Sequence, residues 1–195
     1  MKPKWLRHLP NFLTFCNLAI GLGVICAMIH NHTAMGLRLA CHLIFAAVLL
    51  DCLDGQLARR FNVCTEMGRW LDSFADFISF GVAPVVVFVT HVPSVSPVLI
   101  ILLLVYPLAG VFRLVRHYLQ RQCEFFTGLP ITISGSILAA VLLVRSYLQS
   151  EFSQAFIVVF LILTAALAVL MVSRFRINRV VCRRICDESN WQEAS

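Results

Sequence analysis

Long apolar runs separated by short polar connections make up most of the chain. A helix needs about 20 apolar residues to cross the hydrocarbon core of a bilayer, and six runs are long enough. They predict transmembrane helices at about 11–30, 35–58, 69–90, 96–117, 130–149 and 153–174. No internal repeat or low-complexity tract interrupts them. The pattern therefore predicts an all-α integral membrane protein with six transmembrane helices in one bundle.

The two ends of the chain differ from this pattern. The bundle is expected to occupy residues 1–174, and residues 175–195 to form a basic cytoplasmic tail. A basic amphipathic helix on the membrane surface is the alternative for this segment, and we favour the tail. The basic start and the apolar stretch after it resemble a signal peptide. Because the stretch is long and lacks a small-residue cleavage site, it predicts a retained first span.

The composition agrees with a membrane protein. Hydrophobic residues make up 59% of the chain and charged residues 13%, whereas soluble proteins have about 25% charged residues. The mean hydropathy is +0.85. The eight cysteines are scattered, and neither a CxxC motif nor a zinc-binding spacing appears. We interpret them as reduced thiols that fill space within helices.

The net charge of +6 follows from where the basic residues lie. Fourteen of the sixteen lysines and arginines precede the first span, follow the sixth, or lie at the second-to-third and fourth-to-fifth junctions. Arg38 and Arg145 are the two exceptions. The positive-inside rule then places both termini in the cytoplasm. Anionic lipid headgroups account for the positive charge, so no nucleic-acid partner is expected.

Four of the five aspartates lie close together, at the end of the second predicted span and the start of the third. One helical stripe contains Asp51, Asp54, Gly55 and Ala58, and the next contains Gly68, Asp72 and Asp76. These spacings place each set on one face of its helix. Because the connection is short, we expect the helices to be antiparallel neighbours whose carboxylates face each other.

An ionised carboxylate within a span costs about 2.5–3.5 kcal/mol on insertion scales. Protonation or a hard divalent cation would relieve four of them, and oxygen ligands favour magnesium, manganese or calcium over zinc. The alternative is that the aspartates are solvated at the interface and paired with Arg59, Arg60 and Arg69. Four carboxylates on two facing stripes favour a metal site. The small residues between them would allow either close helix packing or room for a flat group such as a nucleobase.

The whole pattern resembles the signature of the CDP-alcohol phosphatidyltransferases. Its fixed positions read Asp51-x2-Asp54-Gly55-x2-Ala58-Arg59-x8-Gly68-x3-Asp72-x3-Asp76. The stretch LPNFLTFCNL is similar to the first helix of that family. The resemblance implies transfer of the phosphatidyl group of CDP-diacylglycerol to an alcohol, with release of CMP. It also implies a homodimer in the bacterial inner membrane, in contact with membrane lipids, with its active site facing the cytoplasm.

Residue roles follow from the same resemblance. Asp51, Asp54 and Asp72 would bind Mg²⁺ or Mn²⁺, and Asp76 would be the catalytic general base and a further metal ligand. The CDP-diacylglycerol site would be lined by Asp54, Gly55, Ala58, Arg59 and Gly68. A divalent cation transporter is the alternative of a different class. It would place charges near mid-membrane on several helices, whereas these lie on two helices near one surface.

Three further stretches concern the acceptor alcohol: FADFISFGVAP (74–84), FRLVRHY (112–118) and FTGLPITISGS (126–136). They resemble the serine-specific branch of the family, the bacterial membrane-bound phosphatidylserine synthases, and so imply L-serine. Arg113 and Arg116 would bind the serine carboxylate or a phosphate, with membrane anchoring as the alternative. Ser79 would contact the polar substrate or bond within its own helix. Pro84 is expected to kink the third span.

One departure leaves glycerol 3-phosphate as the nearest alternative acceptor. In the serine branch the arginine pair is followed by Phe-Asn, and here it is followed by His117-Tyr118.

Asn11, Thr14 and Asn17 lie at the inner end of the first span at i, i+3 and i+6. They point either to the active cavity or to helix capping and packing.

Overall fold

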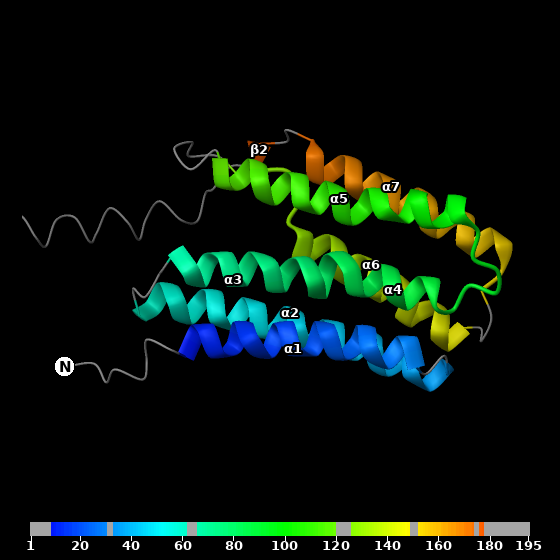
Figure 1. The fold of residues 1–195 in the computed structure, drawn as a ribbon, viewed down its shortest axis with the longest axis horizontal. Helices are drawn as coiled ribbons and strands as arrows, with labels where there is room; N and C mark the ends of the chain where they lie inside the picture. Colours follow the sequence, from blue (N-terminus) through cyan, green and yellow to red (C-terminus); the bar gives the residue numbers. More distant parts are fainter. Residues whose placement is uncertain are drawn as a thin grey trace, which may run out of the picture.

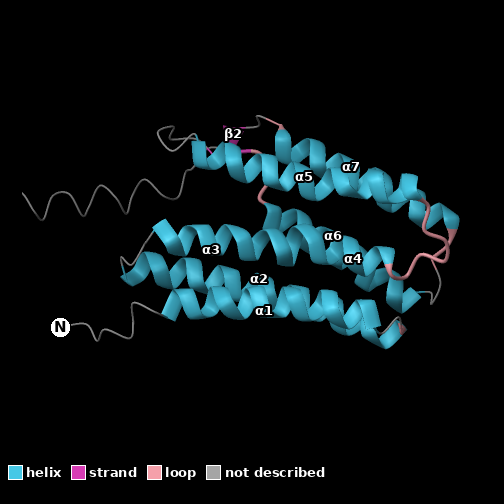
Figure 2. Ribbon diagram, viewed as in Figure 1, coloured by secondary structure: helices cyan, strands magenta, loops and turns pink. Residues whose placement is uncertain are grey.

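The computed structural model describes residues 9–30, 33–61, 66–119, 126–148, 152–173 and 176–177. The structure is helical apart from one pair of two-residue strands (Figures 1 and 2). The elements are α1 (Leu9–His30), α2 (Ala34–Phe61), α3 (Glu66–Asp76), the π-helix η2 (Phe77–Val82), α4 (Ala83–Val89), α5 (Pro97–Leu119), β1 (Phe126–Thr127), α6 (Ile131–Leu148), α7 (Gln154–Val172) and β2 (Arg176–Ile177).

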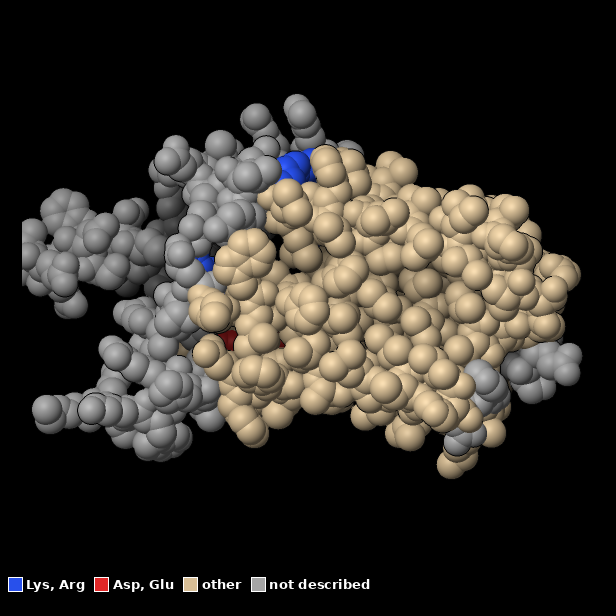
Figure 3. Space-filling model, in the orientation of Figure 1, with Lys and Arg blue, Asp and Glu red and all other residues tan. Residues whose placement is uncertain are grey.

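Six helices are long and apolar enough to cross a membrane, which confirms the predicted number. The third of them joins α3, η2 and α4 into one span, Met67–Val89. The described surface in Figure 3 is almost entirely uncharged, and its few charged atoms lie toward one end of the molecule. The structure is that of a multi-pass membrane protein. The basic tail lies outside the described residues beyond β2, so the domain boundary stays a prediction.

The spans form two groups. Helix α1 packs along α2 and also on α3, and α2 packs on α6. Helices α5 and α7 run side by side at the upper edge of Figure 1. The η2 segment contacts α1, α4, α5 and α6, so it is the point where the two groups meet.

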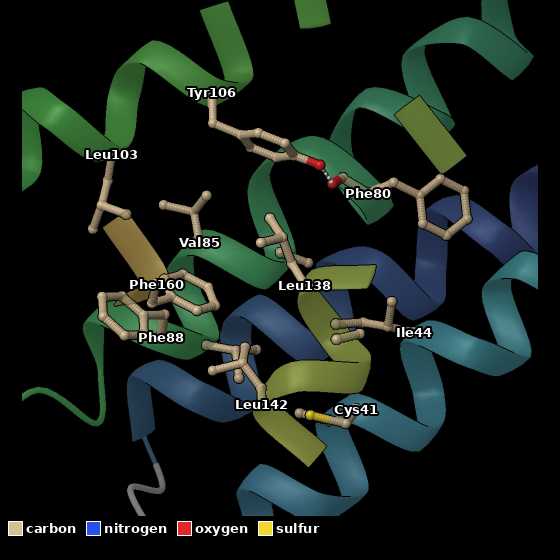
Figure 4. Close-up of a cluster of buried hydrophobic side chains, with 14 of the residues drawn as sticks. Cys41, Ile44, Phe80, Val85, Phe88, Leu103, Tyr106, Leu138, Leu142 and Phe160 are labelled. Carbon is tan, nitrogen blue, oxygen red and sulfur yellow. Dashed lines mark hydrogen bonds between the residues drawn. The ribbon is translucent and has the colours of Figure 1, made fainter. Parts of the chain in front are cut away.

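Large apolar side chains fill the centre of the bundle (Figure 4). Ile44, Phe80, Leu138 and Leu142 are each almost fully buried. Toward the far end, Phe88 stacks on Phe160 with 4.0 Å between ring centroids. Burying a side chain of this size stabilises a protein by about 1.5–3 kcal/mol when the side chain would otherwise be exposed to water. When it would otherwise be exposed to lipid, close packing between helices provides the stabilisation instead.

The third span is irregular just before Pro84. Sequence analysis predicts a kink there, and the structure has the π-helix η2, which ends two residues before the proline. The Ala83 amide donates to the Ile78 carbonyl, five residues back, in place of the usual four. A π segment contains one extra residue per turn and is common at functional sites.

A close contact fixes the connection that precedes α6. Gly128 has φ +86° and lies against the Met171 carbonyl near the end of α7. Only glycine takes this conformation without strain, and no space exists for a side chain. The Leu129 amide donates to the Leu170 carbonyl at 3.3 Å. Strands β1 and β2 pair antiparallel beside this contact, which joins the start of α6 to the end of α7.

Candidate active site

Three carboxylates meet where α2 and α3 face each other. Asp51, Asp72 and Asp76 each contribute one oxygen to a group whose members all lie within 4.8 Å of one another. Asp51 and Asp76 are also within hydrogen-bonding range of each other. We call these three residues the carboxylate group. They are half-buried, and acidic atoms appear in Figure 3 only as small areas recessed among uncharged side chains.

Uncharged donors from α1 and α6 orient these acids. Thr14 Oγ1 donates to Asp54 Oδ2 at 3.0 Å, Thr132 Oγ1 to Asp51 Oδ2 at 3.2 Å, and Asn17 Nδ2 to Asp76 Oδ1 at 3.5 Å. The two α1 residues are the ones for which sequence analysis left site and packing roles open. Their side chains reach the acids. A third helix therefore takes part in the arrangement.

Helix α1 also determines how far apart the acid-bearing helices lie. It packs extensively on both α2 and α3, whereas the backbones of α2 and α3 approach each other only sparsely in the described part of the chain. The predicted facing stripes are present in Asp51, Asp72 and Asp76. Both acid-bearing helices pack on α1, so α1 links them.

Asp54 and Asp72 differ in how they are satisfied. Asp54 is only 4% exposed and accepts the Thr14 bond, and it lies outside the 4.8 Å group. Asp72 Oδ1 is buried and has no hydrogen-bond partner among the described residues. A buried acceptor without a donor is rare in folded proteins. This oxygen points to a ligand that is not part of the chain.

The charges of the carboxylate group support the same conclusion. Two ionised carboxylates 4.8 Å apart repel by about 3 kcal/mol at an effective dielectric constant of about 20. Three such pairs form in the group. A divalent cation bound by oxygen ligands would offset this repulsion, and its preferred donors are the ones present. The residues therefore fit a magnesium-type or manganese-type ion.

The two arginines of the predicted pair have different surroundings. Arg113 is 9% exposed, its Nε has no hydrogen-bond partner, and its charge interacts with Asp76. Arg116 donates to the Val172 carbonyl at 2.8 Å and to the Ser173 carbonyl at 3.5 Å. Arg113 therefore faces the carboxylate group, while Arg116 satisfies carbonyls at the end of α7.

The other predicted site residues lie around the acids. Gly55 is half-buried in α2, one residue after Asp54, and Gly68 is half-buried in the first turn of α3. Ala58 and Arg59 belong to α2, but their side chains are outside the described residues. Ser79 is fully buried in η2, where its hydroxyl donates to the Asn17 carbonyl at 3.1 Å. That bond joins two spans and does not lie within its own helix, and the contact with substrate stays a prediction.

Sequence analysis missed Thr132 as a member of the site. It lies in the stretch FTGLPITISGS, which we had linked to the acceptor and not to the acids. Its hydroxyl reaches Asp51 because α6 packs on α2. The polar residue just after the Gly-Leu-Pro turn was the available signal.

Residues 7–172 match the family model described as CDP-alcohol phosphatidyltransferase, which covers most of the chain. The chain belongs to this family. The acids that converge in the structure are therefore those of the family signature. The match includes all six spans, so family and fold describe the same bundle.

Curated relatives share this region at moderate identity. A CDP-diacylglycerol–serine O-phosphatidyltransferase of Bacillus subtilis (strain 168) is 33% identical over 135 residues, 68% of this chain and 74% of the relative. One of the same name from Mycobacterium leprae (strain TN) is 37% identical over 134 residues, 64% of this chain and 43% of the relative. An archaetidylserine synthase of Methanothermobacter thermautotrophicus is 34% identical over 175 residues, 88% of this chain and 70% of the relative.

Proposed function

We propose that this protein transfers the phosphatidyl group of CDP-diacylglycerol to L-serine, forming phosphatidylserine and releasing CMP. The observation that supports it most is the meeting of three signature aspartates within 4.8 Å in a chain of this family. The names of the relatives supply the acceptor, since two bacterial relatives are serine transferases and the archaeal one is a serine synthase by name.

Asp51, Asp54 and Asp72 would hold a divalent cation, Mg²⁺ or Mn²⁺, with Asp76 as a further ligand. Such an ion would draw charge from the pyrophosphate and stabilise CMP as the leaving group. The buried and unpartnered Asp72 Oδ1 supports this assignment. So do the fixed orientations of Asp51 and Asp54, whose second oxygens are engaged by Thr132 and Thr14.

Asp76 is the proposed general base. It would take the proton from the serine hydroxyl as that oxygen forms a bond to the phosphate next to the lipid. The bond between this phosphate and the CMP oxygen breaks in the same displacement, and CMP leaves with the bonding electrons. Asn17 supports this role because its amide donates to Asp76 Oδ1 and leaves the other carboxylate oxygen for the proton.

Arg113 is the proposed acceptor-binding residue. Its side chain is buried, and its charge interacts with that of Asp76. From there it could bind the carboxylate of serine in a two-pronged contact. Arg116 and Ser79 stay predictions as substrate-binding residues, since both make bonds within the protein. Gly55, Ala58, Arg59 and Gly68 are proposed to line the CDP site, with Arg59 near a phosphate.

The proposed setting is the bacterial inner membrane, with the carboxylate group facing the cytoplasm. The distribution of basic residues supports this orientation. A site near that interface lets the lipid nucleotide enter from the inner leaflet while serine arrives from water. A homodimer is the expected assembly.

Release of CMP tests the proposal directly. Purified protein in detergent is given CDP-diacylglycerol and Mn²⁺ or Mg²⁺, with serine, glycerol 3-phosphate or inositol phosphate as the acceptor. We expect release with serine and its loss in Asp76→Asn. Asp187→Asn is a matched control, because Asp187 is the one aspartate outside the signature.

Each other outcome has a distinct meaning. Release with glycerol 3-phosphate and not with serine would keep the chemistry and overturn the acceptor. No release with any acceptor, from protein shown to be folded, would contradict the transferase and favour cation transport. Equal activity in Asp76→Asn and wild type would remove Asp76 from the role of base.

A further inference from the structure

A tyrosine far from the acids in the sequence holds the main chain next to Asp76. Pro84 has no amide hydrogen, so it cannot donate to the carbonyl four residues earlier, which is that of Phe80. The Tyr106 hydroxyl of α5 donates to this carbonyl at 3.1 Å (Figure 4). Both residues are fully buried. The tyrosine therefore satisfies an acceptor that the proline leaves without its helical donor.

The hydroxyl has a second acceptor within reach. The Tyr106 hydroxyl also lies in donating geometry to Ser134 Oγ at 3.2 Å, while Ser134 donates its own proton to the Ile131 carbonyl at 2.9 Å. A hydroxyl has one proton, so the tyrosine proton is shared between the Phe80 carbonyl at 3.1 Å and Ser134 Oγ. Removing the serine hydroxyl would leave the Phe80 carbonyl as the acceptor.

The π segment that contains Phe80 is fixed from several sides. Gly135 of α6 packs so closely that a Cβ there would lie 2.6 Å from the Phe80 carbonyl oxygen. On the opposite side Ser79 bonds to the Asn17 carbonyl of α1 and lies against Gly21. The segment thus has little freedom to return to regular α-helical hydrogen bonding.

The position of this segment connects it to the chemistry. Asp76 is the residue immediately before η2, so the turn that presents its carboxylate continues directly into the π segment. Reverting to an α-helix would rotate one side of the junction by about 100° relative to the other. Such a rotation would move Asp76, together with Asp72 on the same helix, relative to Asp51 on α2.

We propose that the Tyr106 hydroxyl is a positioning group: by bonding the Phe80 carbonyl it maintains the π segment and thereby directs Asp76 into the carboxylate group. This rests on the proposed function, in which Asp76 acts at a divalent ion. The tyrosine ring alone would satisfy the packing, whereas the hydroxyl serves the main chain.

The test is Tyr106→Phe, which removes the hydroxyl and keeps the ring. Mn²⁺ binding to the detergent-solubilised protein is measured by the loss of the free-ion EPR signal, and kcat and KM for serine are measured separately. A buried hydrogen bond contributes about 0.5–1.5 kcal/mol. We therefore expect about a three- to tenfold weaker Mn²⁺ affinity and a similar fall in kcat, with KM for serine within twofold.

Two variants serve as controls. Tyr147→Phe makes the same chemical change on a tyrosine that is 60% exposed at the opposite end of the bundle. Ser134→Ala removes the second partner and keeps the bond to Phe80. Both are expected to bind Mn²⁺ as wild type does. If Tyr106→Phe does not fold, Gly135→Ala, which displaces Phe80 from the α6 side, is expected to weaken Mn²⁺ binding in the same way.

The outcomes separate this proposal from the function it rests on. Unchanged Mn²⁺ affinity and kcat in Tyr106→Phe, with only a lower melting temperature, would show a purely structural hydroxyl and overturn the proposal. An inactive wild type with every acceptor would refute the transferase. Mn²⁺ affinity that falls in Tyr106→Phe but not in the two controls would support the positioning role independently of turnover.

Discussion

The two ends of the bundle differ in the partners of their charged side chains. At the end formed by the start of α2 and the end of α6, Arg38 donates to the Ser146 carbonyl at 2.9 Å and stacks over the Tyr147 ring at 4.5 Å. Arg145 lies over the Phe156 ring at 5.0 Å. At the other end, three carboxylates share a space of 4.8 Å and their donors are uncharged.

The difference separates a structural arrangement from a functional one. The guanidinium groups of Arg38 and Arg145 contact a carbonyl and aromatic rings, which are groups of the protein itself. The carboxylate group instead gathers three acidic side chains in one space. Natural proteins accept such local instability where a ligand or a reaction requires it. Four changes test whether the two ends differ in this way.

Removal of divalent ions should have the largest effect. Treatment with EDTA is expected to abolish CMP release and to lower the melting temperature, because the carboxylates then repel one another. Saturating Mn²⁺ should restore both, and an ion at 100 times its Kd stabilises by about 2.7 kcal/mol. Activity that survives dialysis against EDTA would contradict a metal site. The melting temperature of Asp51→Asn is the control, since it should respond less to Mn²⁺.

Asp72→Asn should separate stability from activity. The change keeps the shape of the side chain and removes one of the repelling charges. Without metal we expect a more stable protein, by about 1–3 kcal/mol, and with Mn²⁺ a loss of about 10²–10⁴-fold in kcat. Thermal unfolding in detergent and CMP release measure the two quantities. A less stable metal-free variant would show that the carboxylates are not under mutual repulsion.

Substitutions of the two arginines of the pair should have different effects on serine turnover. Arg113→Gln is expected to lower kcat/KM for serine about 10- to 100-fold, because it removes a charge-assisted hydrogen bond of about 1.5–3 kcal/mol. Arg116→Gln should lower stability by about 1 kcal/mol, through the lost bonds to the end of α7, and leave KM for serine within twofold. Equal effects of both substitutions on KM would restore the predicted joint role.

The smallest effect is expected at the opposite end. Arg38→Gln removes a bond to the Ser146 carbonyl and the stacking on Tyr147, and should lower stability by about 1 kcal/mol. Its kcat and KM should equal those of wild type once the protein is folded. A change in KM would mean that the far end influences the site.

The sequence was sufficient to predict the spans, for a strict physical reason. A segment in lipid must be long, apolar and helical, and the predicted boundaries fall within three residues of those observed for the helices and the composite third span. The aspartate stripes were also predictable, since residues three and four apart share a helix face. The meeting of Asp51, Asp72 and Asp76 follows that spacing.

The other features of the site depend on tertiary packing, which the sequence pattern does not show. Arg113 and Arg116 lie three positions apart, about 60° around a helix, and only the position of α7 shows that the second is taken by carbonyls. Thr132 joins the site because α6 packs on α2. The π segment depends on a main-chain register that hydrophobic periodicity does not encode, although Pro84 indicates an irregularity.

The packing of α1 on both α2 and α3 has a consequence for how the protein is assembled. Consecutive helices α1 and α2 can pair as a hairpin as soon as both are in the bilayer. The acids are divided between α2 and the span that follows it, so a cation site cannot form at that stage. It arises only when α3 takes its place against α1. Ion binding at the proposed site would therefore report that α3 has packed against α1.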